Sequence, residues 1–172
     1  MNRYLFVIDY QNDFVDGALG FPGAEKLDGK IAEKIRAYGK GKVLFTRDTH
    51  FADYMNTQEG KNLPVKHCIQ NTPGWEIYPE LDVLRKTAPI DKITFGSSAL
   101  PEILAKEEHV ESITFLGLCT DICVISNVMI TKAFFPEVPV IVDAKGCAGV
   151  TPESHKNALA AMKMCQVTVI NE

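Results

Sequence analysis

The stretch from residue 112 to residue 128 constrains the fold more than any other part of the chain. It reads SITFLGLCTDICVISNV, and it starts as an apolar run rich in β-branched residues. Such a run is typical of a strand buried inside a parallel sheet, and Gly117 interrupts it. Apolar residues then recur at helical spacing as far as Phe134. The stretch predicts a strand over residues 112–116 that turns directly into a helix over residues 121–134.

A cysteine falls in the first turn of this predicted helix. Thr120 suits the N-cap position, and Asp121 places a negative charge where the helix dipole favours it. Cys123 follows three residues after the cap, where unpaired backbone N–H groups favour a thiolate. A small buried thiol fits the same position, because free cysteine is among the most buried residue types. The stretch alone leaves both interpretations open.

Strand-like and helix-like patterns alternate along the rest of the chain. We expect strands at residues 4–8, 42–46, 88–94, 112–116, 139–143 and 166–170, and helices at 24–38, 77–84, 100–107, 121–134 and from Thr151 onward. This alternation predicts an α/β fold with three layers, in which helices cover both faces of a central, mostly parallel sheet. Ligands bind such sheets at the carboxyl ends of the strands, near a switch in strand order.

Length and composition fit one soluble globular domain over residues 1–172. The hydrophobic fraction of 46% is ordinary, and the net charge of −4 without a basic cluster argues against a nucleic-acid partner. No apolar run is long enough for a membrane span, and the N-terminus lacks the features of a signal peptide. An odd number of cysteines, five, shows no disulfide spacing, so we expect free thiols in a cytoplasmic protein.

Three residues near expected strand ends offer nucleophilic chemistry. Asp9 could act as a general base, Lys92 could orient Asp9 and stabilise an anion, and Cys123 could attack a carbonyl carbon. Backbone N–H groups in the turn from Cys119 to Cys123 could form an oxyanion hole. Each side chain also has a structural interpretation: Asp9 as a turn cap, Lys92 as a solvated cation and Cys123 as part of the core.

A second group of polar residues lies in and beside a long segment, residues 49–75, that shows little periodicity. Segments of that length without regular structure are usually functional. The group comprises Asp48, His50, Glu59 and His67. Carboxylate and imidazole ligands suit zinc, manganese or iron(II), although spacing alone favours a chance surface cluster. Cys68 is a softer competing ligand, and we expect His109 and His155 to lie on surface segments without a special role.

Several segments together carry a family resemblance. They read VIDYQNDF at residues 7–14, RDTH at 47–50, DKITFGSSAL at 91–100, GLCTDICV at 117–124 and HKNALAAMKMCQV at 155–167. The chain resembles the isochorismatase-like cysteine hydrolases over nearly its whole length, and the nicotinamidase branch is nearest. The resemblance implies a catalytic triad of Asp9, Lys92 and Cys123. It also implies a cis peptide before Cys119, whose amide would join that of Cys123 in the oxyanion hole.

The resemblance further implies one bound divalent metal, with zinc foremost and manganese or iron as alternatives. Three metal ligands match Asp48, His50 and His67, and Glu59 takes the fourth place by position. The implied reaction is hydrolysis of nicotinamide to nicotinate and ammonia through a thioester, as in NAD salvage, by a homodimer or homotetramer. True isochorismatases lack the cysteine nucleophile, so Cys123 disfavours that activity. A metal-independent relative that cleaves a ureido or carbamoyl group, or a non-catalytic binding module, remains as an alternative.

One departure concerns the substrate pocket. Nicotinamidases usually carry an aromatic residue just before the last metal histidine, whereas this chain has Leu-Pro-Val-Lys at residues 63–66. Phe14 matches the other ring-packing aromatic of the family, and we expect Phe95 or Trp75 to contribute further contacts to substrate.

Overall fold

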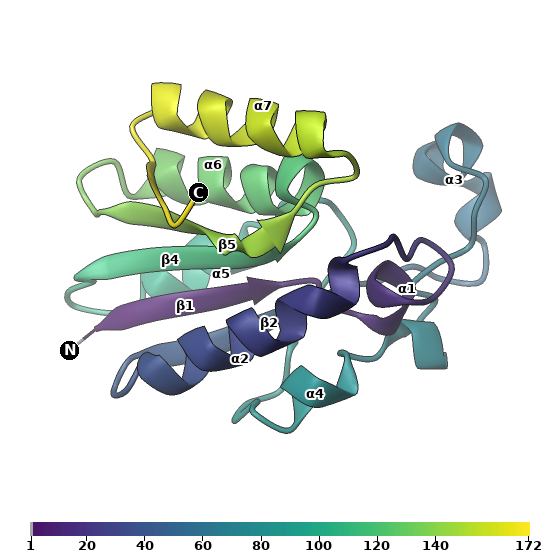
Figure 1. The fold of residues 1–172 in the computed structure, drawn as a ribbon, viewed down its shortest axis with the longest axis horizontal. Coiled ribbons are helices and arrows are strands. Elements are labelled where there is room, and N and C mark those ends of the chain that lie inside the picture. The colour runs from purple at the N-terminus through teal and green to yellow at the C-terminus, as the bar shows by residue number, and fades with distance from the viewer. Residues whose placement is uncertain (1) are drawn as a thin grey trace.

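Six parallel strands form a single sheet in the computed structural model, which describes residues 2–172 (Figure 1). The strands are β1 (Arg3–Ile8), β2 (Lys42–Asp48), β3 (Ile90–Lys92), β4 (Ser112–Leu118), β5 (Val140–Ala148) and β6 (Thr168–Ile170). Their order is β3-β2-β1-β4-β5-β6. The chain therefore reverses its direction of travel between β1 and β4, and the carboxyl ends of these two strands form the switch point at which such sheets bind ligands.

Two layers of helices cover this sheet, which confirms the predicted three-layer α/β fold. Helices α2 (Asp28–Ala37) and α4 (Pro79–Asp82) lie on one face, while α5 (Ala99–Leu104), α6 (Ile125–Phe134) and α7 (Pro152–Met164) lie on the other (Figure 1). Right-handed crossovers account for this division, because the connections from β1 to β3 and those from β3 to β6 run across the sheet in opposite directions.

Shorter helical segments fill the connections. They are α1 (Asn12–Val15), α3 (Gln58–Asn62), the 3₁₀ turns η1 (Ala24–Leu27), η2 (Tyr54–Asn56) and η3 (Pro73–Trp75), and the π turn η4 (Thr120–Val124). Segment α3 projects from the body of the molecule beyond the carboxyl ends of the strands (Figure 1). Among residues 2–172 no helix has the length and apolar character needed to cross a membrane.

The central strand β1 is the best-buried element, as its continuous apolar sequence predicts. Tyr4 to Ile8 are each at most 1% exposed, and the Phe6 ring stacks on Phe115 of β4 at 5.3 Å. Gly117 of β4 has a φ of 122°, and a Cβ there would lie 2.1 Å from the carbonyl oxygen of Ile8. Only glycine permits this approach of the two central strands next to the switch point.

Several expected boundaries are wrong, for local reasons. Strand β4 continues through Gly117 to Leu118, because the left-handed glycine bends the strand without ending its pairing with β1. The helix predicted from residue 121 begins instead as a π turn, and α6 follows it. The long segment 49–75 holds α3, in which the Thr57 hydroxyl accepts a hydrogen bond from the Gly60 amide at 3.0 Å. A helix of one turn is too short to show periodicity.

The last helix follows its sequence signals closely. Thr151 caps α7 by accepting a hydrogen bond from the Ser154 amide at 3.0 Å, and Pro152 occupies the first turn. The Ser154 hydroxyl in turn accepts from the Thr151 amide at 3.0 Å, which completes a capping box.

Candidate active site and metal centre

A cavity of about 530 Å³ opens at the carboxyl ends of β1 and β4, at the switch point. Its lining is mainly apolar and comes from α1, α3, the segment after β3 and the turn η4. The lining residues are Phe14, Leu19, Asp48, Gln58, Glu59, Asn62, Leu63, His67, Ile93, Thr94, Phe95, Cys119, Ile122 and Cys123. Members of both groups that the sequence singled out therefore line the cavity: Cys123 of the thiol group, and Asp48, Glu59 and His67 of the metal group.

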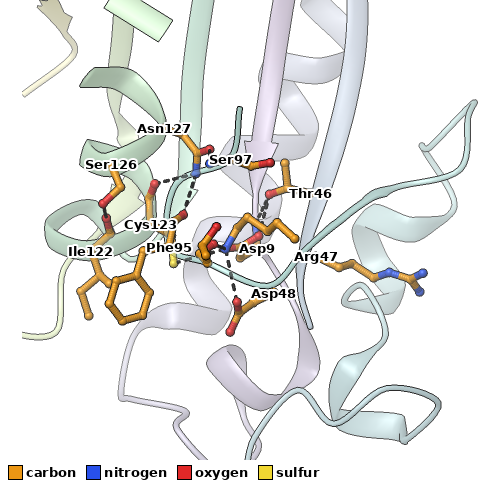
Figure 2. Close-up of polar contacts among 12 residues, drawn as sticks. Asp9, Thr46, Arg47, Asp48, Phe95, Ser97, Ile122, Cys123, Ser126 and Asn127 are labelled. Atoms are coloured by element: carbon orange, nitrogen blue, oxygen red, sulfur yellow. Dashed lines mark hydrogen bonds and ion pairs between the residues drawn. The ribbon is translucent and has the colours of Figure 1, made fainter. Parts of the chain in front are cut away.

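The structure brings Asp9, Lys92 and Cys123 together at this cavity, and Figure 2 shows Asp9 close to Cys123. The Lys92 ammonium nitrogen lies 2.6 Å from Asp9 Oδ2 and 3.7 Å from Cys123 Sγ. All three residues are at most 4% exposed. They come from three separate strand ends, since Asp9 follows β1, Lys92 ends β3 and Cys123 lies in the turn after β4. This arrangement fits general-base activation of a thiol; the catalytic roles of the residues stay predictions.

Burial dominates the protonation of the thiol. It raises the pKa of Cys123 well above its ordinary value, and the nearby Lys92 ammonium opposes this only in part. The expectation that the turn favours a thiolate in the resting protein is therefore wrong. A protonated thiol needs a base before it can act as a nucleophile, and Asp9 is the carboxyl beside it. Burial raises the pKa of Asp9 as well, although the positive charge of Lys92 opposes this rise.

The turn that carries the thiol differs from its expected form. Cys119, not Thr120, is the cap residue, and the Ile122 and Val124 amides both donate to its carbonyl at 3.1 Å. The Thr120 hydroxyl is engaged elsewhere, with Nδ1 of His155 at 2.8 Å. His155 is thus half-buried against this turn, and the expectation of a plain surface histidine is wrong. The Leu118–Cys119 peptide is cis, as the family resemblance implies.

The predicted metal ligands form one cluster at the other side of the cavity. Asp48, His50, Glu59 and His67 each present one ligand atom, and these atoms lie within 4.8 Å of one another. His50 Nε2 lies 3.0 Å from Asp48 Oδ2 and 3.5 Å from Glu59 Oε1. His67 Nε2 lies 3.7 Å and 3.6 Å from the same two oxygens. Cys68 does not belong to this cluster, so the alternative of a thiolate ligand is not supported.

Two features of the histidines fit a divalent ion. The Nδ1 atom of His67 lies 2.8 Å from the Val65 carbonyl oxygen, a contact that leaves the Nε2 lone pair for a metal. His50 Nε2 is buried and makes no well-oriented hydrogen bond among residues 2–172, although Asp48 Oδ2 lies 3.0 Å away, and such a nitrogen is free to bind a metal. Burial opposes a charge on His50, but Asp48 and Glu59 outweigh it and raise its pKa to about 9. The carboxylates therefore favour a cation at this point.

The two groups share one side chain. Asp48 Oδ1 lies 3.3 Å from the Lys92 nitrogen, while Oδ2 faces the histidines. Gln11 fixes the backbone of this residue, because its Oε1 accepts from the Asp48 amide at 2.7 Å and its Nε2 donates to the Asp48 carbonyl at 2.9 Å. Thr46 supports the other carboxylate, with its hydroxyl donating to Asp9 Oδ1 at 2.6 Å. Sequence reasoning missed Gln11 and Thr46, although Gln11 lies inside the VIDYQNDF segment.

The three aromatic residues expected to contact substrate have different positions. Phe14 lines the cavity with its ring 5.6 Å from that of His67, and Phe95 lines it while 44% exposed. Trp75 is not among the lining residues, so its predicted role is wrong. Its indole N–H donates to the Thr49 hydroxyl at 2.9 Å, and the Arg47 guanidinium covers its ring at 3.4 Å.

Comparison with known proteins identifies the family. The isochorismatase domain family matches residues 3–172. The nicotinamidase/pyrazinamidase of Mycobacterium tuberculosis (strain ATCC 25618 / H37Rv) is 26% identical over 98% of both chains. The nicotinamidase of Escherichia coli (strain K12) is 28% identical over 94% of this chain and 90% of its own.

Solved structures of similar proteins share the whole fold. The nicotinamidase/pyrazinamidase of Bacillus subtilis superposes with a TM-score of 0.85 at 28% identity, covering 99% of this chain and 100% of its own. The pyrazinamidase of Pyrococcus horikoshii, solved in complex with zinc, superposes with a TM-score of 0.83 at 25% identity over 100% of both chains. Because the family match spans nearly all of the sequence, the chain belongs to the isochorismatase family.

Proposed function

We propose that this protein is a metal-assisted cysteine amidohydrolase that converts nicotinamide and water to nicotinate and ammonia. The observation that carries the proposal is the position of Lys92, whose ammonium contacts Asp9, Asp48 and the Cys123 thiol at the base of one cavity. The names of the similar proteins, nicotinamidase and pyrazinamidase, support an amide substrate. Formation of nicotinate would place the enzyme in NAD salvage.

The first half of the reaction forms a thioester. Asp9 takes the proton of the Cys123 thiol, and the thiolate attacks the carboxamide carbon. The resulting oxyanion accepts hydrogen bonds from the amides of Cys119 and Cys123. Asp9 then gives its proton to the amide nitrogen, the carbon–nitrogen bond breaks, and ammonia leaves. Lys92 holds Asp9 in place throughout and offsets the negative charge that develops.

The second half regenerates the thiol. Asp9 takes a proton from water, the hydroxide attacks the thioester carbon, and Cys123 leaves with the proton that Asp9 returns. Phe14 and Phe95 pack against the ring, which orients the reacting carbon. Asp48, His50, Glu59 and His67 would hold the metal. When bound, a divalent ion there supplies a Lewis acid that can fix a ring nitrogen directly or through water.

The decisive assay compares ring amides. Ammonia release is measured with nicotinamide, pyrazinamide and benzamide at matched concentrations. Benzamide lacks the ring nitrogen, so we expect its kcat/KM to be at least about tenfold lower, the effect of losing one good polar contact in a buried site. Turnover of a ureido or carbamoyl compound without turnover of either heteroaromatic amide would refute the nicotinamidase assignment and favour the metal-independent alternative.

A further inference from the structure

Asn127 of α6 has a buried polar side chain that takes no part in the proposed reaction. The residue is 0% exposed and lies one helical turn after Cys123. Its Nδ2 donates to the Cys123 carbonyl at 2.8 Å and to the Phe95 carbonyl at 3.0 Å, and its Oδ1 accepts from the Ser97 amide at 3.0 Å (Figure 2). Both donors and the acceptor of the side chain are thus engaged.

Two of these hydrogen bonds hold an irregular segment, residues 93–97, that forms one wall of the cavity. Ile93, Thr94 and Phe95 line the cavity from this segment, which has no strand or helix of its own. At its start the Lys92 ammonium donates to the Thr94 carbonyl at 3.1 Å. Near its end, the Asn127 side chain donates to the Phe95 carbonyl and accepts from the Ser97 amide. The wall is therefore bonded at one end to the cation beside the thiol and at the other to the helix after the thiol.

The neighbouring Ser126 shows what a helix-only contact looks like. Its hydroxyl donates to the Ile122 carbonyl at 2.6 Å, four residues back, as Asn127 does to Cys123 (Figure 2). Such a bond to the preceding turn is common for short polar side chains in helices. The additional reach of Asn127 to Phe95 and Ser97 is therefore the feature that requires an explanation.

We infer that Asn127 is a positioning residue that fixes the cavity wall at residues 93–97 relative to the Cys123 thiol. A ring that rests on this wall meets the sulfur at the correct distance only while the wall is held, since small misplacements of a reacting group have large effects on rate. A small molecule that reaches the thiol without touching the wall gains nothing from Asn127. Asn127 thereby sets the preference of the site for ring-bearing over small substrates. The inference rests on the proposed function only in taking this cavity as the substrate site.

Alkylation of Cys123 tests this directly and requires no amide hydrolysis. The folded protein is treated with iodoacetamide or with N-benzyl-iodoacetamide, each of which forms a sulfur–carbon bond as iodide leaves and the thiol proton is released. Mass spectrometry that distinguishes Cys123 from Cys119 gives the rate at Cys123. The measured quantity is the ratio of the benzyl rate to the iodoacetamide rate, which cancels any general change in thiol reactivity.

The informative variant is Asn127→Ser. A serine hydroxyl can still donate to the Cys123 carbonyl, as Ser126 does to Ile122, but it cannot reach Phe95 or Ser97. We expect the ratio to fall about tenfold, the effect of two lost buried hydrogen bonds on wall placement, with the iodoacetamide rate nearly unchanged. Asn127→Leu, which keeps the branch at Cγ and removes all three bonds, should lower the ratio at least as much.

Ser126→Ala is the matched control, since it removes a bond to the turn but none to the wall; its ratio should equal that of the unaltered protein. An unchanged ratio in Asn127→Ser and Asn127→Leu would overturn the inference, and so would an equal slowing of both reagents. An Asn127→Ser protein that no longer folds, judged by circular dichroism, would also overturn it, because Asn127 would then hold the fold rather than the wall. Absence of nicotinamide turnover in the unaltered protein would count against the proposed function, but it would not affect the conclusion drawn from the alkylation ratio.

Discussion

The two sides of the cavity are built in different ways. The thiol side takes Asp9, Lys92 and Cys123 from the ends of sheet strands, and all three are almost fully buried. The metal side takes Glu59 and His67 from the long connection between β2 and β3, and the Glu59 side chain is 24% exposed. Strand ends and the turn η4 fix the first set, whereas local turns and a one-turn helix fix Glu59 and His67. We therefore expect the thiol side to tolerate less change.

Replacement of the thiol should have the largest effect. Cys123→Ala should abolish turnover, by about 10⁴-fold or more, because no other group can form the covalent intermediate. Circular dichroism should show an intact fold. Cys119→Ala should keep most activity, since only the backbone N–H of Cys119 is expected to act. Full activity in Cys123→Ala with loss in Cys119→Ala would reverse the assignment of the nucleophile.

Removal of the metal side should have the next largest effect. His50→Ala combined with His67→Ala should abolish metal binding, measured by elemental analysis, and should lower turnover by more than the roughly 100-fold seen when outer-shell partners of a metal are removed. The unaltered protein should contain close to one equivalent of divalent metal. Metal-free protein with full activity would show that only the thiol side is needed.

A support residue on the thiol side should have an intermediate effect. Thr46→Val keeps the shape of the side chain but removes the hydroxyl that donates to Asp9. We expect kcat to fall about tenfold, because a buried carboxylate loses a hydrogen bond worth about 1–3 kcal/mol. The metal content should not change. A matching fall in metal content would indicate that the two sides are less separate than their construction suggests.

The smallest expected effect concerns the pH dependence of stability near the turn η4. Burial lowers the pKa of His155, which lies beside Thr120. The unfolded chain therefore binds a proton more readily than the folded one, and stability should fall as the pH drops below about 6.5, the ordinary histidine value. His155 should contribute less than about 3 °C of this fall in melting temperature, and His155→Gln should remove that contribution. His109→Gln, at an exposed histidine, is the control and should leave the decline unaltered.

Sequence patterns located the six strands because buried parallel strands carry a continuous apolar signal, although β2, β4 and β5 extend beyond their predicted ends. Asp9 and Lys92 fall where apolar runs end, so topology alone placed them at one edge of the sheet. The family resemblance then identified Glu59 as the fourth metal ligand, which spacing alone could not do. Both signals are local in the chain, and they sufficed for the architecture and for the members of the thiol and metal groups.

The supporting residues could not be predicted in the same way. Thr46, Gln11 and Asn127 are polar residues in or beside buried elements, and each acts through hydrogen bonds to residues at least 30 positions away. The sequence left the burial of Cys123 open, because its accessibility depends on how η4 packs against α6 and α7. Trp75 shows the reverse error: its chemistry suits a ring-binding role, but the Arg47 guanidinium covers its ring and Thr49 accepts its N–H.

The double contact of Asp48 limits how such a site can be redesigned. One oxygen neutralises Lys92 and the other faces His50 and His67, so a neutral replacement would alter the charge around the thiol as well as the affinity for metal. Removing the Asp48 carboxylate to abolish metal binding would therefore also change the thiol chemistry. A designer would have to keep a carboxylate at position 48 and change only His50, Glu59 and His67.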